Sequence, residues 1–141
     1  MNVKRFVITG IVASILFLVL DAVFGVLGGV IGQQAFGIPA GAPDESKMGL
    51  GLLFELVNGF MLAAVYAVIY PALPGKGWVK GLSYGMIVWG LRVLMWAFST
   101  YMMTAMSPAL IGITVLTGLV EALIICVVIA TLYPGSRLTV A

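Results

Sequence analysis

The chain has 141 residues, of which 62% are hydrophobic and only 9% are charged, and its mean hydropathy is +1.20. Soluble domains carry about 25% charged residues, so this composition predicts a membrane protein with a single domain over residues 1–141. The net charge of +2 is too small and too dispersed to indicate nucleic-acid binding. There is no histidine, and the one cysteine, Cys126, lies in an apolar run, so we expect no bound metal, no cofactor and no disulfide.

Four apolar segments follow one another along the chain, and each is long enough to cross a membrane. About 20 residues of helix cross a hydrocarbon core about 30 Å thick. No segment has the polar face that a helix in water needs, which disfavours both a soluble bundle and a set of buried strands. We therefore expect an all-α, four-helix transmembrane bundle. Its spans are predicted over residues 6–32, 48–71, 81–106 and 108–133.

Basic residues near the ends of the spans predict the orientation. The side opposite the termini carries only one of them, Lys47, beside two acids. By the positive-inside rule both termini are cytoplasmic, and we expect an integral protein of a prokaryotic inner (cytoplasmic) membrane. The basic residues on the cytoplasmic side are Lys4, Arg5, Lys76, Lys80 and Arg137.

The connections between the spans are rich in proline and glycine. Residues 33–47 are predicted to form an irregular outer loop, and the connection at Ser107 and Pro108 is so short that the last two spans must be antiparallel neighbours. The second and fourth spans both end in Tyr-Pro, which is compatible with two repeated helical hairpins. An aromatic belt at the cytoplasmic interface is predicted from Tyr70, Trp78, Tyr84 and Tyr133.

Arg92 lies in the middle of the third span, between Trp89 and Trp96. An arginine at the centre of a membrane costs about 3 kcal/mol or more unless another group compensates its charge. With α-helical periodicity the three side chains share one stripe, so the guanidinium can stack on an indole. The sequence therefore predicts that the other spans supply the counter-charge.

Each of the other spans contains one carboxylate, and Asn58 follows Glu55 by one turn. Counting about 1.5 Å of rise per residue from the ends of the spans puts these groups and Arg92 near the midplane of the membrane. We predict that they form one cluster, in which Glu121 is the partner of Arg92. The predicted site is Asp21, Glu55, Asn58, Arg92 and Glu121, flanked by Trp89, Trp96 and Thr117.

Beyond Asp21 the first span carries several glycines close together. They are Gly25, Gly28, Gly29 and Gly32. Small residues at this spacing are typical of helices that pack closely in membranes. We expect another helix to pack against this part of the first span.

The polar cluster has two interpretations. In the structural one, a carboxylate neutralises Arg92 and hydrogen bonds fix the order of the helices. In the functional one, three acids and one base leave two negative charges in excess, so at least one carboxyl holds a proton or binds a cation. In that case Asp21 and Glu55 are expected to share a proton.

The functional interpretation predicts passage of a proton, a cation or a small solute across the membrane. The alternative is a non-catalytic accessory subunit that scaffolds a larger membrane complex and contacts lipid or quinone. An enzyme is not expected, since the chain has no Gly-x-Ser-x-Gly or HExxH motif. The expected partners are the lipid bilayer and either further copies of the chain, in a homo-oligomer, or other membrane subunits.

Overall fold

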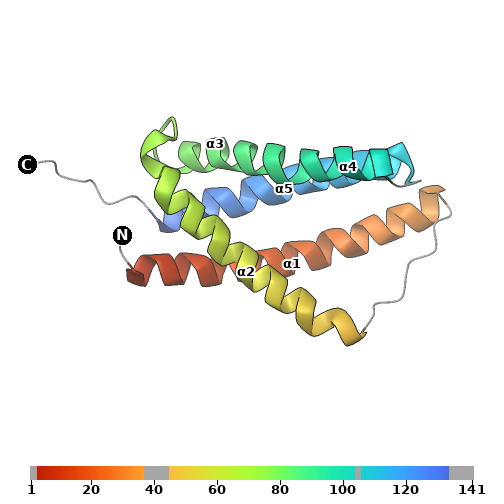
Figure 1. Ribbon diagram of the computed structural model, residues 1–141, viewed down its shortest axis with the longest axis horizontal. Helices are drawn as coiled ribbons and strands as arrows, with labels where there is room; N and C mark the ends of the chain where they lie inside the picture. Colours follow the sequence, from red (N-terminus) through yellow and green to blue (C-terminus); the bar gives the residue numbers. More distant parts are fainter. Residues whose placement is uncertain (1–2, 37–44, 104–105, 134–141) are drawn as a thin grey trace, which may run out of the picture.

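The computed structural model describes residues 3–36, 45–103 and 106–133, and these ranges contain helices and short connections but no strand. Most of the predicted outer loop, together with Pro134 and Arg137, lies outside them. Figure 1 shows the arrangement of the helices. In chain order they are α1 (Val3–Phe36), α2 (Glu45–Ile69), the 3-10 helix η1 (Tyr70–Ala72), α3 (Trp78–Val88), the π-helix η2 (Trp89–Leu94), α4 (Met95–Met103) and α5 (Pro108–Leu132).

Within the described residues, four helical stretches are long and apolar enough to cross a membrane, and their bounds agree with those of the predicted spans to within three residues at each end. Large apolar side chains cover their outer surfaces; Val68, for example, is 77% exposed. A continuous apolar surface of this kind indicates contact with lipid or with other proteins. The fold is therefore compatible with an integral membrane protein. The stretches are Val3–Ile31, Met48–Ala72, Trp78–Met103 and Pro108–Leu132.

The helices form two closely packed pairs, α1 with α2 and α3 with α5, and α1 also packs against α5. Small residues permit the close approach in both pairs. A Cβ on Gly59 of α2 would collide with Ser14 of α1, whose hydroxyl oxygen lies 2.9 Å from the carbonyl oxygen of Leu56. A Cβ on Gly81 of α3 would lie 2.5 Å from the Cα of Val127 in α5. The predicted antiparallel pairing of the last two spans is confirmed.

The glycines that follow Asp21 do not form the predicted helix contact. A Cβ on Gly25, Gly28 or Gly29 would meet nothing within 4 Å, and the surroundings of Gly32 lie outside the described part of the chain. The prediction is wrong because α1 crosses α2 before Asp21, where Ser14 of α1 meets Gly59 of α2. Beyond that crossing the two helices diverge (Figure 1).

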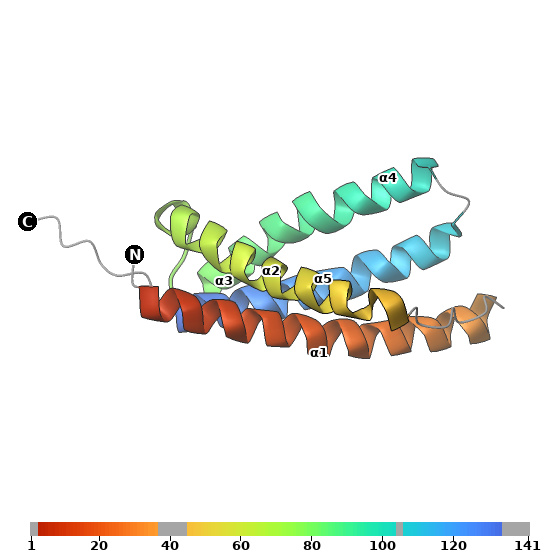
Figure 2. The ribbon, with the colours of Figure 1, turned by 60° about the horizontal axis from the view of Figure 1, so that its bottom comes forward.

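The packed core lies toward one end of the molecule, where the first turns of α1 meet the last turns of α2 and α5. The Tyr66 and Tyr84 rings lie 5.3 Å apart there, and the Tyr84 hydroxyl donates to the carbonyl oxygen of Leu62 at 2.8 Å. Toward the other end the helices diverge, and Figure 2 shows α4 rising away from α1. The largest fully buried side chains are Phe17, Tyr66, Tyr84, Ile125 and Ile129.

The predicted aromatic belt is wrong for two of its four residues. Tyr84 is fully buried and Tyr133 is 8% exposed, and both rings pack against Tyr66. Aromatic side chains bury a large area each, and here they fill the packed end of the bundle. Trp78 stays at the surface, where it is 58% exposed.

Candidate functional site

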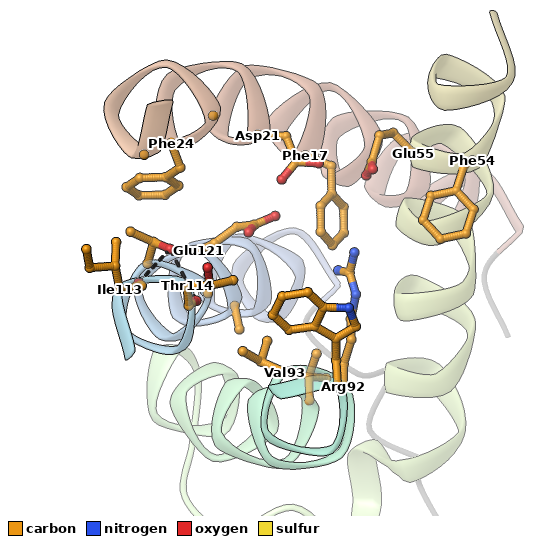
Figure 3. Close-up of a pocket in the computed structure, with 17 residues that line it drawn as sticks. Phe17, Asp21, Phe24, Phe54, Glu55, Arg92, Val93, Ile113, Thr114 and Glu121 are labelled. Atoms are coloured by element: carbon orange, nitrogen blue, oxygen red, sulfur yellow. Dashed lines mark hydrogen bonds between the residues drawn. The ribbon is translucent and has the colours of Figure 1, made fainter. Parts of the chain in front are cut away.

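Where the two helix pairs diverge, the structure contains a cavity of about 740 Å³ (Figure 3). All four spans contribute to its walls. Of the five residues predicted for the core of the site, four line it: Asp21, Glu55, Arg92 and Glu121. Of the three flanking residues, Trp96 and Thr117 line it as well.

The carboxyl groups of Asp21, Glu55 and Glu121 all point into this cavity (Figure 3). Each is an acceptor when ionised, and among the described residues Oε2 of Glu55 and Oε1 of Glu121 are buried without a hydrogen-bond donor. Neighbouring ionised carboxylates repel each other. A proton shared between two of the carboxyl groups would relieve this repulsion.

Arg92 shares this cavity but forms no ion pair shorter than 4.0 Å with a carboxylate of the described residues. Its guanidinium carbon lies 4.8 Å from the centre of the Phe17 ring of α1, a cation–π contact. The predicted pairing with Glu121 is therefore wrong as a direct ion pair between the described residues, and the aromatic partner of Arg92 is Phe17 instead of an indole.

Trp89 does not flank the cavity, contrary to the prediction. Its indole nitrogen donates to the carbonyl oxygen of Val115 in α5 at 3.0 Å. The reason is η2, because a π-helical turn holds one residue more than an α-helical turn and so rotates the residues before it by about 100° relative to those after it. Trp89 and Trp96 therefore leave the common stripe that α-helical periodicity predicts.

Asn58 also lies outside the cavity walls. Its side-chain nitrogen is buried without an acceptor in the described part of the chain, and it is next to Gly59, where α1 crosses α2. The crossing closes the cavity one turn beyond Glu55. The prediction placed Asn58 in the site from its depth along the helix, and depth alone does not show where two helices cross.

Three phenylalanines in the cavity walls were not predicted: Phe17, Phe24 and Phe54. The sequence carries a signal for two of them, because Phe17 and Phe24 lie four residues before and three residues after Asp21, on the same face of α1. Phe54 directly precedes Glu55, and no periodicity identifies it.

Two threonines of α5 add oxygen atoms to the cavity. The hydroxyl of Thr114 donates to the carbonyl of Leu110 at 3.1 Å, and that of Thr117 donates to the carbonyl of Ile113 at 3.0 Å. Because both protons are directed at their own helix, these hydroxyls offer the cavity only acceptor lone pairs. With the three carboxylates, they make the polar part of the cavity rich in acceptors.

Over the described residues, the fold and the cavity together define a helical protein with four potential membrane spans and an acidic, partly open cavity, in whose walls Asp21 and Arg92 are exposed. Comparisons with known protein families, with curated proteins and with solved structures give no match to this chain. The function therefore has to be argued from the cavity itself.

Proposed function

We propose that this chain is a membrane transport protein, and not an enzyme, that passes protons, small cations or a small cationic solute through the cavity. The observation that supports this most directly is that three carboxylates and one guanidinium line one cavity. Fully ionised, they carry a formal charge of 1 − 3 = −2, which is costly inside a membrane. Protons or cations must balance this charge. Their binding and release are the elementary steps of transport, with carboxyl protonation as the switch.

The proposal includes an orientation and an assembly. The start of α1, the α2–α3 connection and the end of α5 lie at the same end of the molecule (Figure 1), so Lys4, Arg5, Lys76 and Lys80 gather there. This supports cytoplasmic termini in a prokaryotic inner membrane. Four helices are few to enclose a complete pathway, so we propose a homo-oligomer, in which the two helix pairs are compatible with a duplicated hairpin.

Proton flux into liposomes tests the proposal. The purified protein is reconstituted with a pH-sensitive dye inside, and acidification is followed after a pH step under a potassium diffusion potential. We expect protein-dependent flux that falls to the level of protein-free liposomes in Glu121→Gln, because glutamine keeps the shape of the side chain but cannot ionise. Glu45→Gln, at the first residue of α2, is the matched control and should keep the flux.

Two results would contradict transport. One is a folded protein that moves neither protons nor K⁺, Na⁺ or methylammonium in liposomes of several lipid compositions. The other is flux that Glu121→Gln leaves unchanged. Circular dichroism and size-exclusion chromatography of each variant establish that it is folded.

A second candidate function is that of an accessory subunit in a larger membrane complex, with lipid or quinone against its third span. It is favoured by the apolar face of α4 at the diverging end, where Phe98 is 66% and Met103 82% exposed. Purification in mild detergent followed by native mass spectrometry distinguishes the two. A stoichiometric second polypeptide supports the accessory role, whereas a homo-oligomer alone contradicts it.

A further inference from the structure

We propose that the cavity binds an organic ammonium ion that carries N–H donors and an apolar body about the size of an aromatic ring. This rests on the proposed function and names the chemical class of the cation. Three features of the cavity support it: its volume, its aromatic walls and its excess of acceptors.

The volume fits an organic molecule better than a metal ion. Sites for small organic ligands occupy about 300–1,000 Å³, and this cavity has about 740 Å³. A hard metal ion instead needs several oxygen atoms that converge to about 2–2.6 Å from one point. Within the described ranges, no three acidic, histidine or cysteine side chains are grouped closely enough to hold a metal ion.

Aromatic rings stand beside the carboxylates in the walls. Those open to a ligand are Phe24, Phe54 and Trp96, from three different spans, whereas the ring of Phe17 is buried and contacts Arg92. The face of such a ring attracts a cation, most strongly where water is excluded. The contact of Arg92 with Phe17 shows this geometry inside the cavity. An ammonium with an apolar body can place its charge near the acids and its body against the rings.

The hydrogen-bond acceptors in the cavity walls favour a ligand that donates hydrogen bonds. The carboxylates and the hydroxyl oxygens of Thr114 and Thr117 offer acceptors, and among the lining side chains only Arg92, Trp96 and a carboxyl that holds a proton can donate hydrogen bonds to a ligand. A ligand with N–H donors satisfies these acceptors, whereas an anion would be repelled and a neutral alcohol would leave the negative charge unbalanced.

Arg92 is the only cationic side chain among the lining residues, so it competes with a bound ammonium. The charged groups that face the ligand are Asp21 on α1, Glu55 on α2, Arg92 on η2 and Glu121 on α5, and α4 contributes the uncharged Trp96. Each positive charge that enters can replace a proton held by a carboxyl. Binding should therefore release protons and weaken as the pH falls.

Isothermal titration calorimetry of the unmodified protein in detergent tests the inference, with heats into protein-free micelles subtracted. The probe is 2-phenylethylammonium. Its comparators are 2-phenylethanol, which has the same body without charge, and methylammonium, which has the charge without the body. We expect both comparators to bind at least about tenfold more weakly, since each lacks either the ionic or the aromatic contribution. Equal binding of either comparator, or no binding of the probe, would overturn the inference.

Matched variants locate the site. Asp21→Asn and Trp96→Leu should each weaken binding of the probe about fivefold or more, whereas Glu45→Gln and Trp78→Leu, which remove the same groups elsewhere, should not. Arg92→Gln should tighten binding, because it removes the competing charge. Weaker binding in folded Arg92→Gln, or equal effects of a cavity variant and its control, would count against the inference. The comparison of probes needs no variant, so it decides the question even if a variant does not fold.

The liposome assay keeps the two proposals separate. Proton flux that depends on Glu121, without binding of 2-phenylethylammonium, would leave transport standing and refute the ammonium ligand. Selective binding of 2-phenylethylammonium, without flux of protons or of 2-phenylethylammonium itself into the liposomes, would support the ligand and refute transport.

Discussion

Substitution of Gly81 by alanine tests the packing of α3 on α5. The added Cβ would lie 2.5 Å from the Cα of Val127 and 2.8 Å from the carbonyl oxygen of Cys126. Ordinary contacts between carbon atoms are about 3.5–4.0 Å, so the helices must separate by about 1 Å. Both opposing atoms belong to the backbone and cannot move aside by a rotamer change. We therefore expect the upper end of the usual overpacking cost, about 3 kcal/mol.

Alanine also favours a helix over glycine by about 1 kcal/mol, which reduces the expected net loss for Gly81→Ala to about 2 kcal/mol. The assay is unfolding of the protein from mild detergent by titration with sodium dodecyl sulfate, followed by circular dichroism. Gly112→Ala in α5 is the matched control, because a Cβ there meets nothing within 4 Å; it should gain up to about 1 kcal/mol. Equal free energies of unfolding for the two variants would refute the packing argument.

Two further substitutions probe single hydrogen bonds between helices in the same unfolding assay. Trp89→Phe removes the indole donor to α5 and should lower the free energy of unfolding by about 1 kcal/mol. Trp78 is exposed, so Trp78→Phe should leave the free energy of unfolding nearly unchanged. An equal decrease in both variants would show that the hydrogen bond to α5 does not contribute to stability. Ser14→Ala removes a hydroxyl whose oxygen lies 2.9 Å from the carbonyl oxygen of Leu56 in α2 and 2.8 Å from that of Gly10 in its own helix, and it should also cost about 1 kcal/mol. Its control is Ser83→Ala, whose hydroxyl bonds only within its own helix, and the reasoning fails if the control loses as much.

The features that the sequence predicted correctly depend on properties of one segment at a time. The length and hydropathy of a run determine whether it can span a membrane, and no knowledge of its neighbours is needed. The cost of a charge in hydrocarbon likewise directs each ionisable side chain toward the interior of the bundle. For this reason Asp21, Glu55, Arg92 and Glu121 could be assigned to one cavity before the helices were placed.

The predictions that failed depend on how the helices meet. The position at which α1 crosses α2 determines that Asn58 is enclosed at the contact and that Gly28 faces the cavity instead of a helix. The turn type of η2 determines where Trp89 points. Neither the crossing point nor the turn type can be obtained from hydropathy and periodicity. A crossing point depends on two segments together, and a periodicity argument assumes α-helical turns, whereas η2 is π-helical.

Because of the π-helical turn, the third span should tolerate the deletion of one residue within η2 better than a deletion within α3 or α4. Removal of one residue from within Trp89–Leu94, such as the 71% exposed Leu91, can be absorbed by a return to α-helical turns, and α4 then keeps its orientation. Removal of one residue from α3 or α4 instead turns all that follows by about 100° in the helix. Related chains that differ in length inside this span should therefore differ at η2, and those without the additional residue should still carry the counterparts of Trp89 and Trp96 on different faces, because α4 keeps its orientation.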